Sequence, residues 1–459
     1  MSLLDGYHMM VVSQYFETLN DFINLELVNK KYQYNMAKFH NNPIPIDKKT
    51  INFFTHIETL NMWSSFDEFF GNDIFGVENE VLSNKINFFR IIIWFEVDYS
   101  FSLKHKNTNF VFKNITYTKE DRAKFKHANI PNTVTKLDSF AFTNANITSI
   151  DVPQQVTSIG DNCFSCCYRL KTVNLSTQLK YIGEECFCEC NALASIDISQ
   201  NVNLLGKRCF TTCNNLTSVS LPKSLSYLPF CCFFKCVHLQ MVKFPHHLSY
   251  IEKCCFARCS ALKTVTIRNI ENFIGEYAFF NCVNLTSINI EGNIQSIESK
   301  CFKRCSSLVD ITLPSGLSFI GNNSFEECTN LSAIKIPQCV TELPRKCFKK
   351  CFKLEIIELP SGLVKMGDMC FFECSKLKNV VLPQTTKELG KECFSRCRRM
   401  KRINLPSGLK EIKLLCFENC TLLRIKIPTT ITIFEESKCH NTGGLKNRFC
   451  LFNRFHLII

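Results

Sequence analysis

The sequence predicts an α/β solenoid of about 13 repeats of 23 residues, with a parallel concave sheet and an N-terminal helical cap. Phenylalanine recurs every 23 residues without a miss from Phe164 to Phe417. A cysteine follows each of these phenylalanines three residues later, from Cys167 to Cys420. A leucine follows six residues later, with Met400 as the only exception. A fixed period of this length is typical of a solenoid, in which each unit buries its apolar face against its neighbours.

The repeat has the consensus L-x-x-I-x-L-P-x-x-L-x-x-I-G-x-x-C-F-x-x-C, which is clearest in residues 308–328 and 400–420. It resembles the 23-residue leucine-rich repeat of BspA-like proteins. That family usually has Ala before the phenylalanine, whereas ten of the twelve units here have Cys. The resemblance implies a leucine-rich repeat horseshoe, which is a curved, non-enzymatic protein that binds other macromolecules and is often a surface antigen.

Each unit is expected to contribute one short strand and one turn. The L-x-x-I-x-L segment predicts a strand of the concave sheet, because its side chains alternate between the core and the surface. The proline after it, as in Pro314 and Pro337, lacks an N–H group and ends the ladder. The I-G-x-x-C-F-x-x-C segment predicts a turn and one helical turn on the convex side, with the two cysteines facing inward beside the phenylalanine.

Residues 1–40 are expected to form two helices, with a cap at Asn20-Asp21 between them. Apolar residues at helical spacing support each helix: Met9, Val12, Phe16 and Leu19 in the first, and Phe22, Leu25, Val28 and Tyr32 in the second. The segment is similar to an F-box at Val12, Tyr15-Phe16, Asp21-Phe22, Leu25 and residues 28–32, although the usual Leu-Pro opening is missing. The resemblance implies binding to a ubiquitin-ligase adaptor. The alternative is a helical cap over the first repeat.

Residues 41–129 are interpreted as an irregular N-terminal cap region. Residues 57–63 suggest a degenerate repeat strand, residues 91–95 a buried strand, and residues 109–117 a half-buried strand. The solenoid is assigned to residues 130–428, and a C-terminal cap and tail to residues 429–459. The first and last units are each one residue short, as expected for capping repeats.

The 29 cysteines are interpreted as free, buried thiols that behave as small apolar side chains. Twenty-two of them lie just before or three residues after a repeat phenylalanine. Equivalent residues of stacked units lie about 4.8 Å apart, so disulfides between units are geometrically possible. The CxxC-like spacings make zinc binding a third interpretation. Residues 1–20 lack the features of a signal peptide, and no apolar run is long enough to span a membrane. These features favour the cytoplasm, whereas the family resemblance allows the cell surface.

The sequence holds no catalytic motif, and neither an enzyme nor a cofactor is expected. Its ten histidines are scattered, and it has no phosphate-binding glycine loop. The net charge of 54 − 41 = +13 could favour anionic partners. The basic runs are Arg345-Lys346, Lys349-Lys350 and Arg398-Arg399. Nucleic acid is not expected, because no aromatic residues are interleaved with these runs.

The outward-facing side chains of the strands make the candidate partner site. In the early repeats these side chains are small and polar, whereas later repeats place apolar residues among charged ones. Exposed apolar side chains with a charged rim are typical of partner sites. The candidate residues are Lys335, Ile356, Glu358, Val381 and Arg402.

The leading hypothesis is therefore a protein-binding repeat scaffold that recognises its ligand on the concave face. A substrate-recognition subunit of a ubiquitin ligase, with an F-box at residues 1–40, is the alternative from another class. An adhesion antigen at the cell surface is the third hypothesis. The sequence does not define the oligomeric state.

Overall fold

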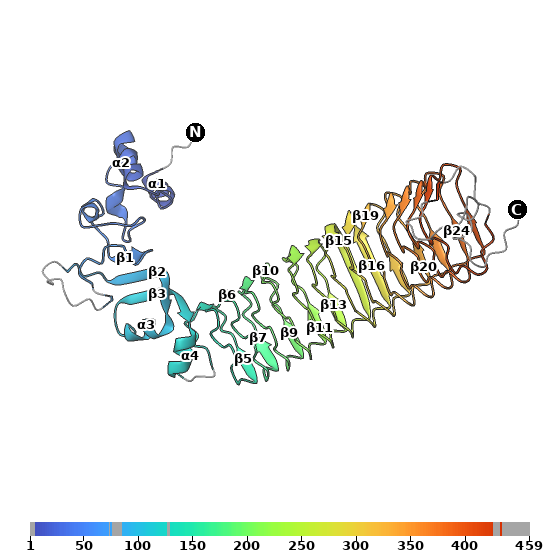
Figure 1. Ribbon diagram of the computed structural model, residues 1–459. Helices are drawn as coiled ribbons and strands as arrows, with labels where there is room; N and C mark the ends of the chain where they lie inside the picture. Colours follow the sequence, from blue (N-terminus) through green and yellow to red (C-terminus); the bar gives the residue numbers. More distant parts are fainter. Residues whose placement is uncertain (1–4, 73, 76–84, 126–128, 426–431, 434–459) are drawn as a thin grey trace, which may run out of the picture. The chain divides into compact units, whose positions relative to one another are not determined.

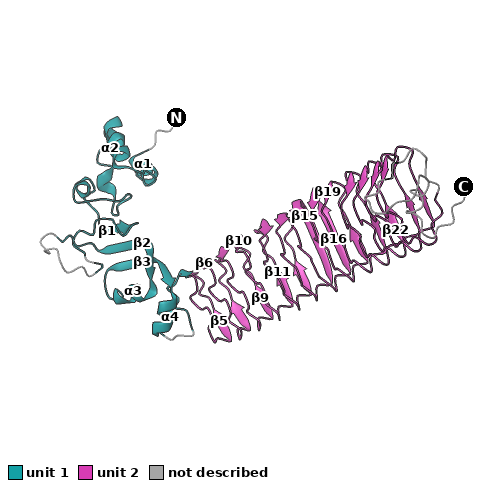
Figure 2. Cartoon of the chain, in the orientation of Figure 1, with its two compact units in different colours: residues 1–138 teal, residues 139–459 magenta. Residues whose placement is uncertain are grey.

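The computed structural model describes residues 5–72, 74–75, 85–125, 129–425 and 432–433. The chain forms two compact units, residues 1–138 and residues 139–459 (Figure 2). The predicted C-terminal cap and tail at 429–459 lie outside the described residues except for the two-residue strand β28, Thr432–Ile433.

Unit 1 begins with the helices α1, Gly6–Ser13, and α2, Leu19–Val28, followed by the 3-10 helices η1, Lys30–Tyr32, η2, Met36–Lys38, and η3, Thr50–Phe53. The α2 cap is Thr18, whose hydroxyl accepts a hydrogen bond from the Asp21 amide while the Asp21 carboxylate accepts one from the Thr18 amide. The predicted cap at Asn20-Asp21 is therefore displaced by two residues. Phe22 is fully buried and contacts the rings of Phe16, Phe39 and Phe54 edge to face at 5.1–5.8 Å.

A parallel sheet occupies most of the region that was expected to be an irregular cap. Its strands in spatial order are β1, Thr59–Met62, β2, Arg90–Asp98, β3, Phe110–Tyr117, and β4, Lys136–Leu137. The short helices α3, Tyr99–Lys104, and α4, Lys119–Phe125, follow β2 and β3. The expectation of a wholly buried strand at 91–95 is wrong, because β2 alternates: Ile91 and Ile93 are buried and Trp94 is exposed.

Unit 2 is an elongated stack of coils, most of which carry two short strands on two separate ladders (Figure 1). The three-residue strands are β5, Ser149–Asp151, β7, Thr172–Asn174, β9, Ser195–Asp197, β11, Ser218–Ser220, β13, Met241–Lys243, β18, Asp310–Thr312, β20, Ala333–Lys335, β22, Ile356–Glu358, β24, Asn379–Val381, and β26, Arg402–Asn404. The two-residue strands are β6, Ser158–Ile159, β8, Tyr181–Ile182, β10, Leu204–Leu205, β12, Tyr227–Leu228, β17, Ser296–Ile297, β19, Phe319–Ile320, β21, Glu342–Leu343, β23, Lys365–Met366, β25, Glu388–Leu389, and β27, Glu411–Ile412. The described strand pairings of unit 2 are parallel, and they are in 23-residue register except at local bulges and between β27 and β28, where Glu411 lies opposite Thr432.

Three longer strands interrupt this pattern in the middle of unit 2. They are β14, Leu248–Ile251, β15, Thr264–Ile274, and β16, Ser287–Gly292. Here the two ladders merge, since β15 pairs with β14 and with both β16 and β17. A register shift between Ile267 and Ile270 accommodates Gly292 at a φ of 119°.

The expected helical turn in each unit is wrong, because the segment around each phenylalanine forms a third inter-coil ladder. Residues two before and two after the phenylalanine lie in the left-handed region, such as Glu185 and Glu189 with φ values of 53° and 60°. The amides of Glu185, Phe187 and Glu189 each donate a 2.8 Å hydrogen bond to a carbonyl of the next coil. These bonds to the next coil alternate with turn bonds inside the segment, such as the one from the Cys188 amide to the Glu185 carbonyl at 3.0 Å.

The core of unit 2 centres on a stack of phenylalanine rings. From Phe142 to Phe417, twelve consecutive pairs have centroids 5.2–5.8 Å apart and planes within 2–21° of parallel. Every ring in the stack is at most 1% exposed. Burial of each ring contributes on the order of 1.5–3 kcal/mol, so this spine is a main source of stability.

The cysteine three residues after each phenylalanine adds a specific contact to this spine. Its thiol donates a hydrogen bond to the backbone carbonyl of the phenylalanine in the preceding coil, and the twelve sulfur-to-oxygen distances are 3.0–3.2 Å. These twelve side chains are fully buried. The recurrence of Cys is therefore explained by hydrogen bonding as well as by its size.

Candidate functional site

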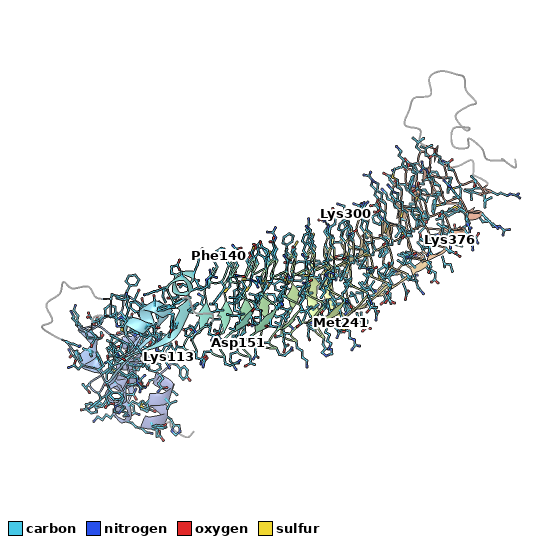
Figure 3. All side chains as sticks on the ribbon, turned by 90° about the horizontal axis from the view of Figure 1, so that it is seen from below. Lys113, Phe140, Asp151, Met241, Lys300 and Lys376 are labelled. Atoms are coloured by element: carbon cyan, nitrogen blue, oxygen red, sulfur yellow. The ribbon has the colours of Figure 1, made fainter. Side chains whose placement is uncertain are left out.

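The exposed side chains of the three-residue strands form a continuous strand face on unit 2. Most of these strands bury the middle residue and expose the two beside it, as in β20, where Ile334 is buried between Ala333 and Lys335. In Figure 3, Asp151 and Met241 lie on one long edge of unit 2, and Phe140 and Lys300 lie on the opposite edge. We call these the strand face and the turn face.

The five predicted site residues all lie on the strand face of four successive strands, β20, β22, β24 and β26. We call Lys335, Ile356, Glu358, Val381 and Arg402 the late strand patch. Ile356 is 59% exposed and Val381 is 75% exposed, which is unusual for aliphatic side chains on a sheet. The Lys335 ammonium lies 3.4 Å from the Glu358 carboxylate, in agreement with the register that places these residues opposite each other.

Two shallow hollows border this patch. The first has a volume of about 430 Å³, and Lys335, Ile356 and Glu358 contribute to its lining. The second has a volume of about 560 Å³, with Val381 and Arg402 in its lining. The sequence thus identified side chains on two neighbouring hollows, although it gave no sign of the hollows themselves.

Sequence reasoning missed other exposed apolar residues on this unit. Met241 on β13 is 50% exposed beside the exposed Lys243, so the late repeats are not the only part of the face that combines apolar and charged groups. Alternation along the strand would have placed Met241 among the outward-facing side chains, but those of the early repeats were interpreted as small and polar. Leu422 is 51% exposed and lines a third hollow, of about 690 Å³, together with Arg402 and Arg424.

The turn face carries ladders of opposite charge between neighbouring coils. Arg304 pairs with Glu327 at 2.9 Å and Arg396 with Glu373 at 2.8 Å. Such exposed pairs support the stack only weakly.

One acidic side chain on this face is buried, which the sequence did not reveal. The Glu326 carboxylate is 6% exposed and lies 2.7 Å from the Lys303 ammonium and 4.0 Å from that of Lys349. Burial acts to raise the pKa of Glu326, but hydrogen bonds from Lys303 and Asn323 outweigh it and hold the pKa below its ordinary value. This carboxylate therefore neutralises part of the positive charge of the basic run Lys349-Lys350.

Metal ligands, membrane-spanning helices and disulfides were also sought in the part of the chain that the structure describes. There, no three His, Cys, Asp or Glu side chains gather as metal ligands. No helix among those residues is both long and apolar enough to cross a membrane. The described cysteines are free thiols, including the 22 at the two repeat positions.

Comparison with known proteins identifies the repeat. The family model described as BspA type leucine rich repeat region (6 copies) matches residues 114–240, 227–355 and 318–446. These matches begin beyond residues 1–40, so the F-box-like resemblance stays a prediction. No curated protein matches the chain.

Solved structures of bacterial repeat proteins are also similar. A leucine-rich repeat protein from Bacteroides ovatus is 27% identical, over 64% of this chain and 83% of its own, with a TM-score of 0.42. A leucine rich cell surface protein from Faecalibacterium prausnitzii is 26% identical, over 59% of this chain and 83% of its own, with a TM-score of 0.40.

Proposed function

Because this chain belongs to the BspA-type leucine-rich repeat family, we propose that it is a non-enzymatic scaffold that binds a protein partner through the late strand patch. One observation carries the choice of surface: Ile356 and Val381 are strongly exposed aliphatic side chains beside the Lys335–Glu358 ion pair. An apolar centre with a charged rim is the usual composition of a protein interface.

The backbone beneath the patch is suited to partner binding. The strands β20 and β22 pair in register, as do β24 and β26, so the backbone positions of the outward residues are fixed before binding. A partner that covers Ile356 and Val381 removes their apolar surface from water without the cost of ordering a loop. Lys335, Glu358 and Arg402 would then select a partner with complementary charges.

The test begins with the full chain and a crosslinking residue at a single exposed position. A photoreactive residue in place of Val381 should capture a partner that the same residue in place of Asn174, an outward position of the early repeats, does not capture. The affinity of the captured protein is then measured for Ile356→Ala and Glu358→Lys against the control Ser218→Arg. Ser218 is on β11, which is remote from the patch.

We expect Ile356→Ala and Glu358→Lys to weaken binding at least about tenfold, which is typical for central interface residues. Ser218→Arg should leave binding unchanged. The thermal unfolding of all three variants should match that of the parent, because none of these side chains fills the core. Equal effects at the early and late positions, or no effect of any variant on a genuine partner, would exclude the late strand patch.

The proposed location is a reducing compartment such as the cytoplasm. Each of the twelve ladder thiols donates its hydrogen to a carbonyl, and that contact requires a reduced sulfur. Alkylation of freshly lysed, denatured protein without reductant should therefore tag nearly all 29 cysteines. Many bridged pairs in that experiment would instead point to an oxidising compartment or the cell surface.

A further inference from the structure

Two cysteines of the turn face lie at equivalent positions on adjacent coils. Cys231 and Cys254 each lie two residues before a spine phenylalanine, and the rings of Phe233 and Phe256 stack with centroids 5.4 Å apart. The strands just before them, β12 and β14, pair in register. Equivalent residues of stacked coils lie about 4.8 Å apart, which is within the Cα range of a disulfide.

This pair differs from the ladder thiols in its access to solvent. Cys254 is half-buried and Cys231 is 8% exposed, whereas the twelve ladder cysteines are fully buried. Neither thiol belongs to the two cysteine positions of the repeat, so neither is needed to fill the core. The two side chains are close enough for each to shift the pKa of the other.

The contact between the two thiols, together with nearby charges, shifts their pKa values in opposite directions. The hydrogen bond from Cys231 and the Lys253 ammonium lower the pKa of Cys254, against the opposing effects of burial and of Glu276. The same contact with Cys254, together with burial, raises the pKa of Cys231, which Arg208 opposes only in part. A thiolate, which is the attacking species, therefore forms more readily on Cys254 than on Cys231.

A third turn-face cysteine provides a comparison within the same chain. Cys188 is also half-buried, but burial and the carboxylates of Glu185 and Glu189 raise its pKa to about 12. Exposure is therefore similar at Cys188 and Cys254, whereas the pKa is raised at Cys188 and lowered at Cys254.

We propose that Cys231 and Cys254 are a redox modification site, at which a low-molecular-weight disulfide such as oxidised glutathione closes a disulfide between two coils. The Cys254 sulfur attacks one sulfur of the reagent, its S–S bond breaks, and one glutathione leaves as a thiolate. Cys231 then loses its proton to that thiolate or to solvent and attacks the Cys254 sulfur, which releases the second glutathione. The two cysteines are oxidised by two electrons, and the reagent is reduced to two thiols.

The test treats the folded, reduced full-length chain with oxidised glutathione, followed by acid quenching, alkylation and peptide mass spectrometry. The parent chain should yield a peptide pair linked through Cys231 and Cys254, with the loss of two hydrogens. In Cys231→Ser, the intermediate should accumulate as glutathione bound to Cys254. In Cys254→Ser, neither product should form at early times. Cys188→Ser is the matched control and should behave as the parent does.

A second measurement does not depend on the variants. In the native parent chain, iodoacetamide should label Cys254 at least about tenfold faster than Cys188, because only the thiolate reacts. Circular dichroism confirms that each variant is folded. Equal labelling of Cys188 and Cys254, or a folded parent chain that yields no linked pair with oxidised glutathione, would overturn the proposal. Faster glutathione attachment to Cys231 in Cys254→Ser than to Cys254 in Cys231→Ser would overturn the assigned order of attack.

Discussion

The thiol of Cys190 donates a 3.2 Å hydrogen bond to the backbone carbonyl of Phe164, which lies 26 residues earlier and one coil away. The contact joins the two most regular features of the repeat, the phenylalanine spine and the cysteine ladder. It gives this carbonyl a second hydrogen bond inside the core, in addition to the 3.2 Å bond from the Cys167 amide. The same contact recurs in every later unit through Cys420.

Because of this contact, the two buried cysteines of one coil should contribute differently to stability. Cys305 donates to the Phe279 carbonyl at 3.2 Å, whereas Cys301 lies at the position that Ala278 occupies one coil earlier. Cys305→Ala should therefore lower the free energy of unfolding by about 0.5–1.5 kcal/mol more than Cys301→Ala. Both variants lose the same volume, but only the first loses a hydrogen bond to the Phe279 carbonyl, which then keeps only its 3.3 Å bond from the Cys282 amide. Urea unfolding of the two variants measures the difference. Equal losses would mean that the thiol contributes only its volume.

The phenylalanine spine should be sensitive to a single truncation. Phe302 stacks between Phe279 and Phe325 at 5.6 and 5.5 Å, and Phe302→Ala should cost about 3–5 kcal/mol from lost burial and a cavity. Phe280, the neighbour of a spine ring in sequence, is half-buried against Tyr277 and is therefore not a suitable control, although the sequence alone would place it outside the core. Phe352 is 41% exposed and serves as the control, and Phe352→Ala should cost less than about 1 kcal/mol. Chemical denaturation compares them, and similar losses would contradict the assigned core.

The left-handed turn positions predict a stabilising substitution. Thr212 has a φ of 60°, a conformation that is unfavourable for a β-branched residue. Thr212→Gly should raise the free energy of unfolding by about 0.5–1 kcal/mol, because relief of this strain exceeds the entropy that glycine adds to the unfolded chain.

The matched control for this substitution is Ser218→Gly on β11, where the backbone is extended. Glycine there should lower the free energy of unfolding by about 0.5–1 kcal/mol. Thermal unfolding should thus shift in opposite directions for the two glycine variants. A loss of stability in Thr212→Gly would show that the threonine side chain makes a contact that outweighs its strain.

The buried Glu326 carboxylate should make stability depend on pH. Its pKa is lowered in the folded state, so its contribution is fully present above the ordinary glutamate pKa of about 4.3 and is lost as the pH falls through the lower folded value. At pH 7, Glu326→Gln should cost about 1–3 kcal/mol, because Lys303 and Lys349 lose their partner.

The difference between this variant and the parent should shrink when the pH is lowered from 7 to about 3, because the parent carboxylate takes up protons as the pH falls toward its lowered folded pKa. Urea midpoints at both pH values provide the measurement. Glu327→Gln is the control, because the Glu327 side chain is 27% exposed and its pair with Arg304 is partly solvated. A constant difference between parent and Glu326→Gln across this range would refute the linkage.

The sequence was sufficient for the features that repeat and insufficient for those that depend on neighbouring coils. The spacing of Phe164 and Cys167 predicted the stacking and the inward face, because periodicity reports burial directly. It could not show that residues such as Glu189 adopt positive φ, since no glycine marks those positions and the compensating hydrogen bonds come from the next coil. A helical turn was therefore expected where a third ladder exists.

The candidate surface could likewise be predicted only in part. Alternation along β22 and β24 placed Ile356 and Val381 on the outside, which the strand geometry reproduces. The hollows beside them arise from the relative lengths of side chains on several coils, so no single repeat encodes them. The Glu326 cluster escaped notice for a similar reason, because its two lysines come from the preceding and the following coil.

The backward reach of each ladder thiol gives the array a direction and a natural unit of growth. Each coil from the one with Phe142 to the one with Phe394 receives a thiol donor from its successor, so this contact is of the same kind at all twelve junctions. Duplication or removal of one 23-residue segment would therefore rejoin a phenylalanine ring, a thiol and a carbonyl of the same kind. Length can vary by whole coils during evolution without a new type of junction, whereas insertion of a single residue would displace all three partners together.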